Sequence, residues 1–278
     1  MSLIFKEEGH LYKDLDPNST IEWKSVTKII GLFKSEFDAE AVAAKCSKNR
    51  KSKWYKIPEE KILEIWKTEN LRATGMGTFY HNEREADLIS CDTLNIEGYD
   101  LPVIPPKIID GLKYAPEQKL NPGIYPEHFV YLTSAGACGQ ADYLDVVNGK
   151  INIMDYKTNK EIKFNGYTNW KGETTCLSEP LTHIEDCNYE HYCLQLSMYM
   201  YMALKHNPHL EPGKLTLRHI IFKQVGENEY GYPIIELDEN DNPVVDEVVI
   251  YELPYLKEEV LAIINHIKNP KKNGIKTI

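Results

Sequence analysis

Long apolar runs are missing from this chain of 278 residues. No stretch approaches the roughly 20 apolar residues that a membrane-spanning helix needs. The N-terminus also lacks the basic start and apolar run of a signal peptide. We therefore expect an intracellular, cytoplasmic protein with no membrane partner. Hydrophobic residues at 42% and charged residues at 27% predict an ordinary globular protein, long enough for one large domain or two small ones.

The chain also lacks closely spaced cysteine pairs and has no surplus of positive charge. The six cysteines include no C-x-x-C pair, so we expect free, reduced thiols. The net charge of −10 argues against a protein that coats nucleic acid by bulk electrostatics. A local basic lining would still attract phosphates. Residues 45–56 interleave basic and aromatic side chains, which makes candidate nucleic-acid contacts of Lys48, Arg50, Lys53 and Trp54. A solvated helix end explains this segment equally well.

Two aspartates are the most informative residues present. Asn148-Gly149 lies between two apolar runs and predicts a two-residue β-hairpin turn, since a type I′ turn needs positive φ at both central positions. Counting back along both strands, this register pairs Asp142 with Asp155. Strand alternation places both acids on the apolar face formed by Leu144, Val146, Ile151 and Ile153. Two buried, opposed carboxylates are costly unless a cation neutralises them, and a hard divalent metal ion would do so.

Lys157 completes a recognisable arrangement. It follows Asp155 by two residues and so projects from the same face of the strand. An Asp-x-Lys end beside a second acid predicts a metal-dependent nuclease site, in which carboxylates hold the metal and the lysine stabilises an anion or positions water. A surface hairpin whose Lys157 forms salt bridges with the aspartates is the alternative interpretation.

Other candidate site residues lie on predicted helices and before a predicted strand. Gln195 and Tyr199 are four residues apart and share one helical face, as do His81 and Glu85. A histidine would add an imidazole ligand, which suits Mn²⁺ as well as Mg²⁺. Glu127, ahead of the first predicted core strand, is a further carboxylate ligand or water-orienting group. Each of these side chains also has an ordinary structural explanation.

Periodicity predicts an α/β protein with helices first and strands later. Helices are expected near residues 25–33, 37–48, 58–70, 76–89, 106–114, 189–206 and 254–268. Strands are expected near residues 3–13 (a hairpin turning at Gly9), 128–133, 138–147, 150–157, 215–225 and 245–253. Residues 164–188 form a long irregular segment of the kind that is usually functional or mobile. We expect one integrated domain, with a mainly helical portion (1–115) carrying the His81 motif and packed on a core (116–278).

Taken in order, these elements resemble the RecB-like branch of the PD-(D/E)XK nuclease superfamily. The likeness rests on Gly77-Thr-Phe-Tyr-His81, Glu127, Gly139-Gln-Ala-Asp142, Asp155-Tyr-Lys157 and Gln195-Leu-Ser-Met-Tyr199. The resemblance spans roughly Ser25 to Leu204, about two-thirds of the chain. Within the branch, Ser25-Val26-Thr27 and the spacing of the acids are most similar to the mitochondrial genome-maintenance exonucleases and related phage exonucleases.

The resemblance implies a restriction-endonuclease-like core, a central mixed β-sheet flanked by helices. It also implies Mg²⁺ or Mn²⁺ as the cofactor and DNA as the substrate. By matching position, metal would be bound by His81, Asp142, Asp155 and the backbone carbonyl of Tyr156. Glu127 and Lys157 would join the aspartates as catalytic residues, with Lys157 assisting the water nucleophile. Gln195 and Tyr199 would orient the DNA backbone.

Two features of such nucleases are not expected in this chain. The late cysteines Cys176, Cys187 and Cys193 are not spaced as in the iron–sulfur members, so no iron–sulfur cluster is expected. A helicase motif is missing too, so processive unwinding would need a helicase or recombination partner. We expect a divalent-metal-dependent DNA exonuclease acting on single strands or free ends. A structure-specific endonuclease and a catalytically inactive nucleic-acid-binding module are the alternatives.

Overall fold

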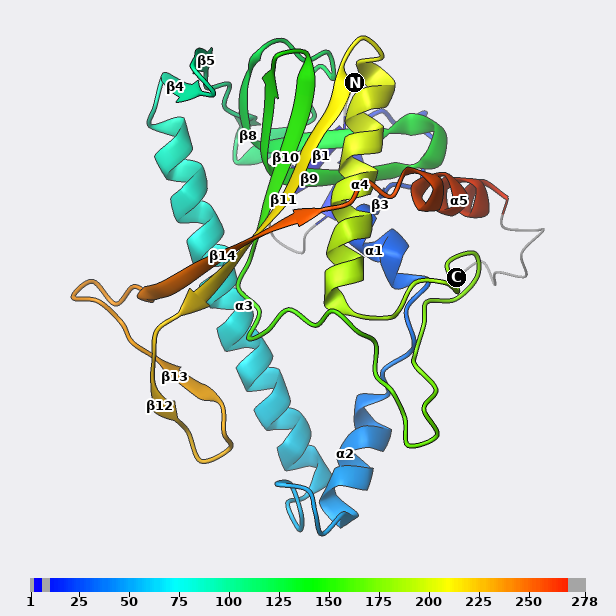
Figure 1. The fold of residues 1–278 in the computed structure, drawn as a ribbon, viewed down its shortest axis with the longest axis vertical. Coiled ribbons are helices and arrows are strands. Elements are labelled where there is room, and N and C mark those ends of the chain that lie inside the picture. The colour runs from blue at the N-terminus through cyan, green and yellow to red at the C-terminus, as the bar shows by residue number, and fades with distance from the viewer. Residues whose placement is uncertain (1–2, 7–10, 270–278) are drawn as a thin grey trace.

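The computed structural model describes residues 3–6 and 11–269 and centres on a six-stranded mixed sheet (Figure 1). Its strand order is β14–β11–β10–β9–β3, and β8 also pairs with β9. Pairing is parallel between β10 and β11 and between β3 and β9, and antiparallel elsewhere. The strands are β3 (Lys24–Ser25), β8 (Gly123–Leu132), β9 (Ala137–Val147), β10 (Lys150–Lys157), β11 (Glu211–Phe222) and β14 (Val245–Leu253).

The turn between β9 and β10 forms as the sequence predicts. Asn148 and Gly149 have φ angles of 51° and 73°, the positive values that a type I′ turn requires. Pairing runs from Lys150–Val147 to Met154–Tyr143 in the expected register. It then stops, one step short of Asp142 and Asp155. The prediction that these two acids are cross-strand partners is therefore wrong, although the register that leads to them is confirmed.

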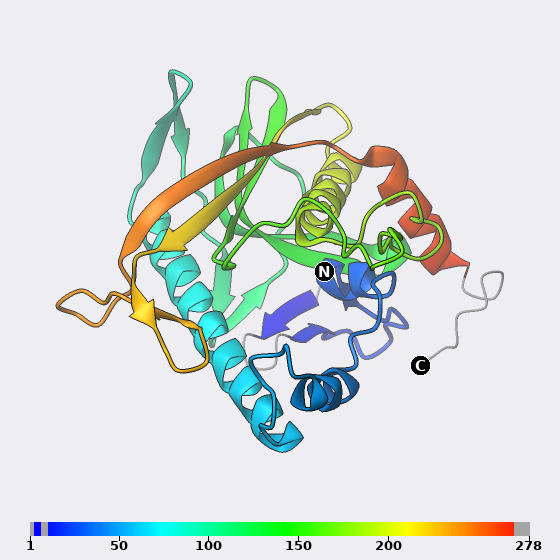
Figure 2. The ribbon, with the colours of Figure 1, turned by 60° about the horizontal axis from the view of Figure 1, so that its bottom comes forward.

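The main core lies on one face of the sheet, under three helices. These are α1 (Val26–Gly31), α4 (Asn188–His206) and α5 (Lys257–Lys268). The apolar face predicted for the hairpin is confirmed, because Leu144, Val146, Ile151 and Ile153 are all buried in this core. Figure 2 shows the sheet, from β14 in orange to the green strands, curving around α4. The helix is thereby wrapped by the strands that carry the acids.

The opposite face is covered by α3 (Glu59–Ile89) and by a small four-stranded sheet. Met76 and Tyr80 of α3 pack against Met154 and Tyr156, which alternate along β10 with the residues of the main core. The small sheet, in the order β2–β1–β7–β6, consists of β1 (Leu3–Lys6), β2 (Leu11–Asp14), β6 (Lys107–Ile109) and β7 (Leu112–Tyr114). The described part of the chain thus forms a mixed α/β structure with helices on both faces of its central sheet.

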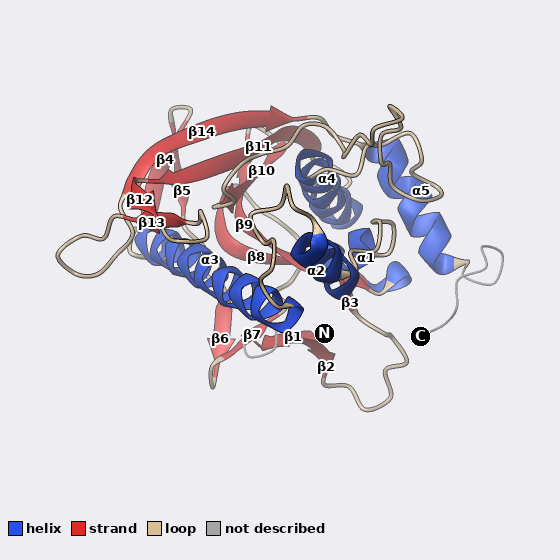
Figure 3. Ribbon diagram, turned by 90° about the horizontal axis from the view of Figure 1, so that it is seen from below, coloured by secondary structure: helices blue, strands red, loops and turns tan. Residues whose placement is uncertain are grey.

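The remaining elements are short and peripheral. Helix α2 (Ala39–Lys48) lies beside the beginning of α3 (Figure 3). The others are β4 (Thr93–Ile96), β5 (Tyr99–Pro102), the 3₁₀ turn Thr133–Ala135, β12 (Gln224–Glu227) and β13 (Pro233–Ile235). Residues 158–187 contain isolated bridges but neither helix nor strand, so the predicted irregular segment is confirmed. No helix among the described residues has the length and apolarity needed to cross a membrane.

Several sequence-based boundaries were wrong, for identifiable reasons. The helices predicted at 58–70 and 76–89 are one helix of 31 residues, because Gly75 and Gly77 stay helical where Met76 and Tyr80 pack against the sheet. The helix predicted to end near Tyr114 is the β6–β7 hairpin. The strand predicted from residue 128 begins at Gly123, so Glu127 lies inside β8 rather than ahead of it. The predicted turn residue Gly9 lies outside the described residues.

Candidate active site

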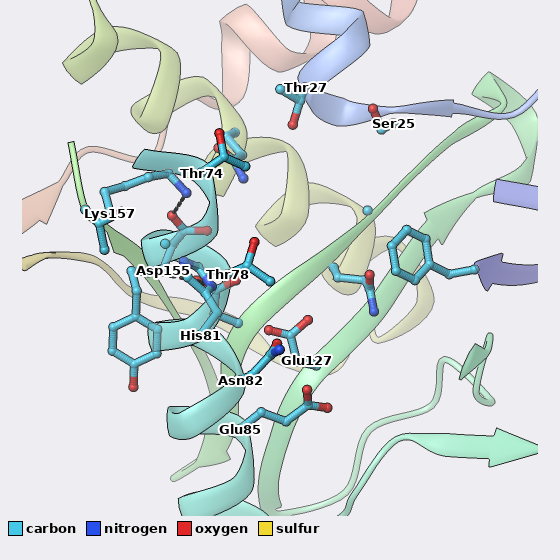
Figure 4. A pocket seen from close by; sticks show the side chains of 18 of the residues that line it. Ser25, Thr27, Thr74, Thr78, His81, Asn82, Glu85, Glu127, Asp155 and Lys157 are labelled. Atoms are coloured by element: carbon cyan, nitrogen blue, oxygen red, sulfur yellow. Dashed lines mark hydrogen bonds and ion pairs between the residues drawn. The ribbon is translucent and has the colours of Figure 1, made fainter. Parts of the chain in front are cut away.

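A cavity of about 570 Å³ collects the residues of all five motifs. It is bordered by α3, by β8, β9 and β10, and by α4, so segments far apart in sequence meet around it. Figure 4 shows His81, Glu127, Asp155 and Lys157 projecting towards this space. The predicted site residues that line it are His81, Glu127, Asp142, Asp155, Tyr156, Lys157, Gln195 and Tyr199. Sequence motifs that are individually weak thus converge on one place.

The cavity lies where β9 and β10 separate. Residues 137–138 of β9 pair with β3 and residues 143–147 pair with β10, so the stretch between them has no strand partner on that side. The Asp142 side chain reaches across this gap, and its Oδ2 accepts a hydrogen bond from the backbone N–H of Tyr156 at 2.7 Å. A side chain here replaces a ladder hydrogen bond. We call this opening the fork; it holds Asp142 in place without burying it in the main core.

The neighbouring strand is interrupted at the same level. The pairing of β8 with β9 skips Glu127 and Asp142, and Glu127 has a φ of 46°. Before this point an odd-numbered residue of β8, Tyr125, faces the main core. After it an even-numbered residue, Val130, does so. Such irregularities are common beside active sites, where they redirect a side chain. Here the interruption brings a carboxylate from β8 to the carboxylate of β9.

Three ligand-type side chains meet at this point: His81 from α3, Glu127 from β8 and Asp142 from β9. One ligand atom from each lies within 4.8 Å of the others, and Nδ1 of His81 is 3.2 Å from Oδ2 of Asp142. Two carboxylates and one imidazole suit Mg²⁺ or Mn²⁺. The donor set therefore fits the divalent ion that the sequence predicts. Among the described residues, this is the one group of three such side chains so arranged.

Crowding and burial perturb the acids of this group. Burial and the neighbouring Asp142 raise the pKa of Glu127 to about 8, against the opposing effect of Lys113. Burial would raise the pKa of Asp142 too, but His81, Lys157 and the Tyr156 N–H outweigh it and hold that pKa low. Burial alone would lower the pKa of His81, yet Asp142 raises it to about 9. Opposed shifts among adjacent groups are typical of functional sites.

Asp155 and Lys157 form a second, adjoining unit. The Lys157 ammonium makes an ion pair with Oδ2 of Asp155, which is 1% exposed (Figure 4). Burial and Asp142 raise the pKa of Asp155 to about 6. Burial disfavours the Lys157 cation, but Asp155 and Asp142 more than compensate and raise its pKa. Lys157 therefore stays protonated at neutral pH. The prediction that Asp155 and the Tyr156 carbonyl bind metal stays a prediction.

Residues that sequence reasoning did not select support this unit. Lys157 Nζ lies 5.2 Å from the ring centroid of Tyr192, whose hydroxyl donates to Oδ1 of Asn159 at 2.6 Å. The ring of His219, on β11, bonds the Asn159 carbonyl at 2.6 Å. Tyr192 lies three residues before Gln195 on α4 and follows Lys157 by 35 positions. Helical spacing from the Gln–Tyr pair was the one signal that could have indicated it.

Lys113 supplies the positive charge behind Glu127. Its ammonium lies 3.1 Å from Glu85 and 3.7 Å from Glu127, and the side chain is buried. Glu85 also lines the cavity, one helical turn beyond His81. Sequence reasoning missed Lys113 because it expected a helix there. Strand β7 instead delivers the lysine from the small sheet, so both sheets contribute to the site.

Gln195 and Tyr199 meet as their spacing predicts. Nε2 of Gln195 donates to the Tyr199 hydroxyl at 3.1 Å, and both line the cavity. Tyr199 is buried against Gly139, where an added Cβ would lie 2.5 Å from Cε1 of the tyrosine. The glycine of the Gly-x-x-Asp motif is therefore needed for this close approach. Of the pair, Gln195 is the more exposed to a bound molecule.

The basic and aromatic segment at 45–56 does not form the surface that its sequence suggests. Trp54 is 6% exposed and stacks on Tyr230 with ring centroids 5.8 Å apart, so the expectation that it is open to a nucleic-acid strand is wrong. Lys53 donates to the Tyr230 carbonyl, and Lys48 lies 3.7 Å from Glu59. Arg50 is exposed. None of these four residues lines the cavity.

Comparison of the chain with protein-family models, with curated proteins and with solved structures finds no match.

Proposed function

We propose that this protein is a divalent-metal-dependent nuclease that hydrolyses DNA phosphodiester bonds. One observation carries the proposal: His81, Glu127 and Asp142 form a ligand group beside the Asp155–Lys157 pair in a single cavity. Carboxylates that crowd together away from solvent are unfavourable unless a cation joins them. The half-buried ammonium of Lys157 next to that group is suited to an anionic substrate such as a phosphodiester.

The chemistry divides between the two units. His81, Glu127 and Asp142 would hold a divalent cation, which would supply Lewis-acid polarisation of the scissile phosphate. Lys157, which remains protonated, donates hydrogen bonds to the developing negative charge and does not act as a general base. Asp155 and the Tyr192 ring fix the lysine's position. Gln195, with its amide anchored on Tyr199, orients the backbone of the bound strand.

The arrangement of the strands is consistent with a restriction-endonuclease-like core. In this proposal, the mixed sheet with its fork between β9 and β10 is that core, and α3 supplies the histidine motif. The size of the cavity favours a single strand as substrate. About 570 Å³ lies in the range of ~300–1,000 Å³ typical of small-ligand pockets, which suits one or two nucleotides rather than a duplex. We therefore propose an exonuclease acting on single strands or free ends.

The decisive experiment is digestion of end-labelled single-stranded and double-stranded oligonucleotides with Mg²⁺, Mn²⁺ or EDTA. We expect cleavage of the single strand with either metal, none with EDTA, and none by Lys157→Ala. Full activity of Lys157→Ala would contradict the proposed chemistry. Cleavage of a covalently closed circular single strand would favour the endonuclease. Metal-independent binding without turnover by the unmodified protein would favour the inactive binding module.

A further inference from the structure

Two aromatic side chains stand out from the segment that joins β10 to α4. Trp170 is 89% exposed and Tyr167 is 75% exposed. Single exposed apolar residues are common, but two large rings three residues apart on one short segment form a surface of the kind that marks an interaction site. Neither ring has another aromatic ring against it among the described ring pairs, so packing does not explain them.

The segment that carries the two rings is ordered by its own hydrogen bonds. We call residues 166–175 the ribbon. The Thr175 N–H donates to the Tyr167 carbonyl at 2.9 Å, and the hydroxyls of Thr168 and Thr174 lie 2.9 Å apart. Across the tip, the Asn169 N–H donates to the Glu173 carbonyl at 3.0 Å. The rings thus project from a hydrogen-bonded ribbon rather than from a loose loop.

The base of the ribbon is tied to the body of the protein. The Gly166 N–H donates to Oε2 of Glu185 at 2.8 Å, and the Asp186 N–H donates to the Thr175 carbonyl at 2.8 Å. Just beyond, Leu177 and Leu181 are buried in the main core. Since a preorganised aromatic surface loses little conformational freedom on binding, the ribbon is suited to capture a flexible partner.

Charge and position indicate what that partner is. Lys171 Nζ lies 5.4 Å from the Trp170 ring centroid, while the ribbon's acid, Glu173, accepts the Asn169 amide at 2.8 Å. An exposed aromatic ring with an exposed cation beside it matches a nucleobase attached to a phosphate. Only residues 160–165 separate the ribbon from Lys157, Thr158 and Asn159, which line the cavity. Figure 1 shows the segment in yellow-green, running from the end of β10 towards the end of the molecule where α2 lies.

We propose that the ribbon is a second binding surface for the single-stranded substrate, on which Tyr167 and Trp170 stack bases while Lys171 contacts phosphate. The inference rests on the proposed function for its choice of ligand. It predicts that a strand is held at two places, at the cavity and at the ribbon. A strand too short to reach the ribbon would bind at the cavity alone.

The test measures binding in EDTA, so that cleavage plays no part. Fluorescence anisotropy of labelled single-stranded oligonucleotides, a long one (dT20) and a short one (dT3), gives affinities for unmodified protein, Trp170→Ala and Tyr167→Ala. We expect each variant to lose about tenfold in affinity for the long strand and nothing for the short one. Trp170→Phe, which keeps a stacking face, should retain most of the affinity. Tyr99→Ala removes a 50% exposed ring elsewhere and is the matched control.

Unchanged affinity of Trp170→Ala and Tyr167→Ala for the long strand would overturn the inference. So would an equal loss for both strand lengths, or a loss in Tyr99→Ala as large as in the ribbon variants. Strand-length-dependent losses with no cleavage under any metal condition would reject the nuclease but keep the ribbon as a nucleic-acid surface. Failure of the two proposals is thereby distinguishable.

Discussion

The two halves of α3 contain similar residue types and use them differently. The second half presents His81 and Glu85 to the cavity, where they meet acids and a lysine from distant strands. The first half buries Ile62 and Ile65 in a cluster with Ala43 and Trp54 and partly buried Tyr230. Ionisable side chains of α3 face the cavity at one end, and apolar and aromatic side chains pack together at the other. What separates them is convergence: the site end faces Glu127 and Asp155, whose pKa values are raised by burial and by the neighbouring Asp142.

The largest expected effect is at the site end. Asp142→Asn removes a ligand charge but keeps the side-chain shape and the acceptor for the Tyr156 N–H, so we expect cleavage to fall roughly 1,000-fold with the fold intact. Asp145→Asn is the matched control, because Asp145 is also buried on β9 but bonds Asn152 at 2.7 Å. Initial rates with Mg²⁺ and the thermal midpoint of each variant check this. Equal losses in both variants would show that the effect is not specific to Asp142 and the cavity.

At the packing end, Trp54→Ala should act on stability instead. Removing a buried tryptophan that stacks on Tyr230 should cost about 3 kcal/mol of the free energy of unfolding. Urea unfolding measures this cost. Cleavage and oligonucleotide affinity, measured well below the unfolding midpoint, should match the unmodified protein. If Trp54→Ala kept full stability but lost affinity for oligonucleotides, Trp54 would be a nucleic-acid contact, as the sequence predicts.

Acid should weaken the sheet around the site, through His128 on β8. Burial lowers the pKa of this histidine to about 4 from an ordinary value of 6.5, so the folded state binds fewer protons than the unfolded state between these values. The buried neutral histidine makes its full contribution to the free energy of unfolding above pH 6.5. As the pH falls from 6.5 towards 4, that free energy decreases by about 3 kcal/mol. The difference in unfolding free energy between unmodified protein and His128→Gln, measured from pH 7 to pH 4, isolates this effect. A constant difference would contradict it.

A smaller effect tests how closely α3 approaches the site. A Cβ at Gly77 would lie 2.9 Å from Oγ1 of Thr158, whereas a Cβ at Gly75 meets nothing within 4 Å. Gly77→Val should therefore displace His81 slightly and slow cleavage about tenfold, since small misplacements in an active site are costly. Gly75→Val should cleave normally. Single-turnover rates compare the two, and similar rates would show that the contact is not restrictive.

Local turn chemistry was predictable and long-range packing was not. Asn148-Gly149 fixed the β9–β10 register from two residues, because few conformations satisfy that turn. Spacing along α4 likewise predicted that Gln195 reaches Tyr199. In contrast, the burial of Trp54 depends on Tyr230, 176 positions later in the chain. The place of Glu127 beside His81 depends on the interruption of the β8–β9 pairing at Glu127, which no local sequence pattern predicts.

Because α3 is one continuous helix, a change of its tilt near Ile65 moves the residues that it presents to the cavity. From Ile65 to His81 the helix rises by about 24 Å at ~1.5 Å per residue. A tilt of about 5° at Ile65 would swing His81 by about 2 Å, more than ligand geometry tolerates. A partner, an antibody fragment or an engineered clamp that binds near Ile65 and tilts the helix would therefore displace His81 without touching the cavity.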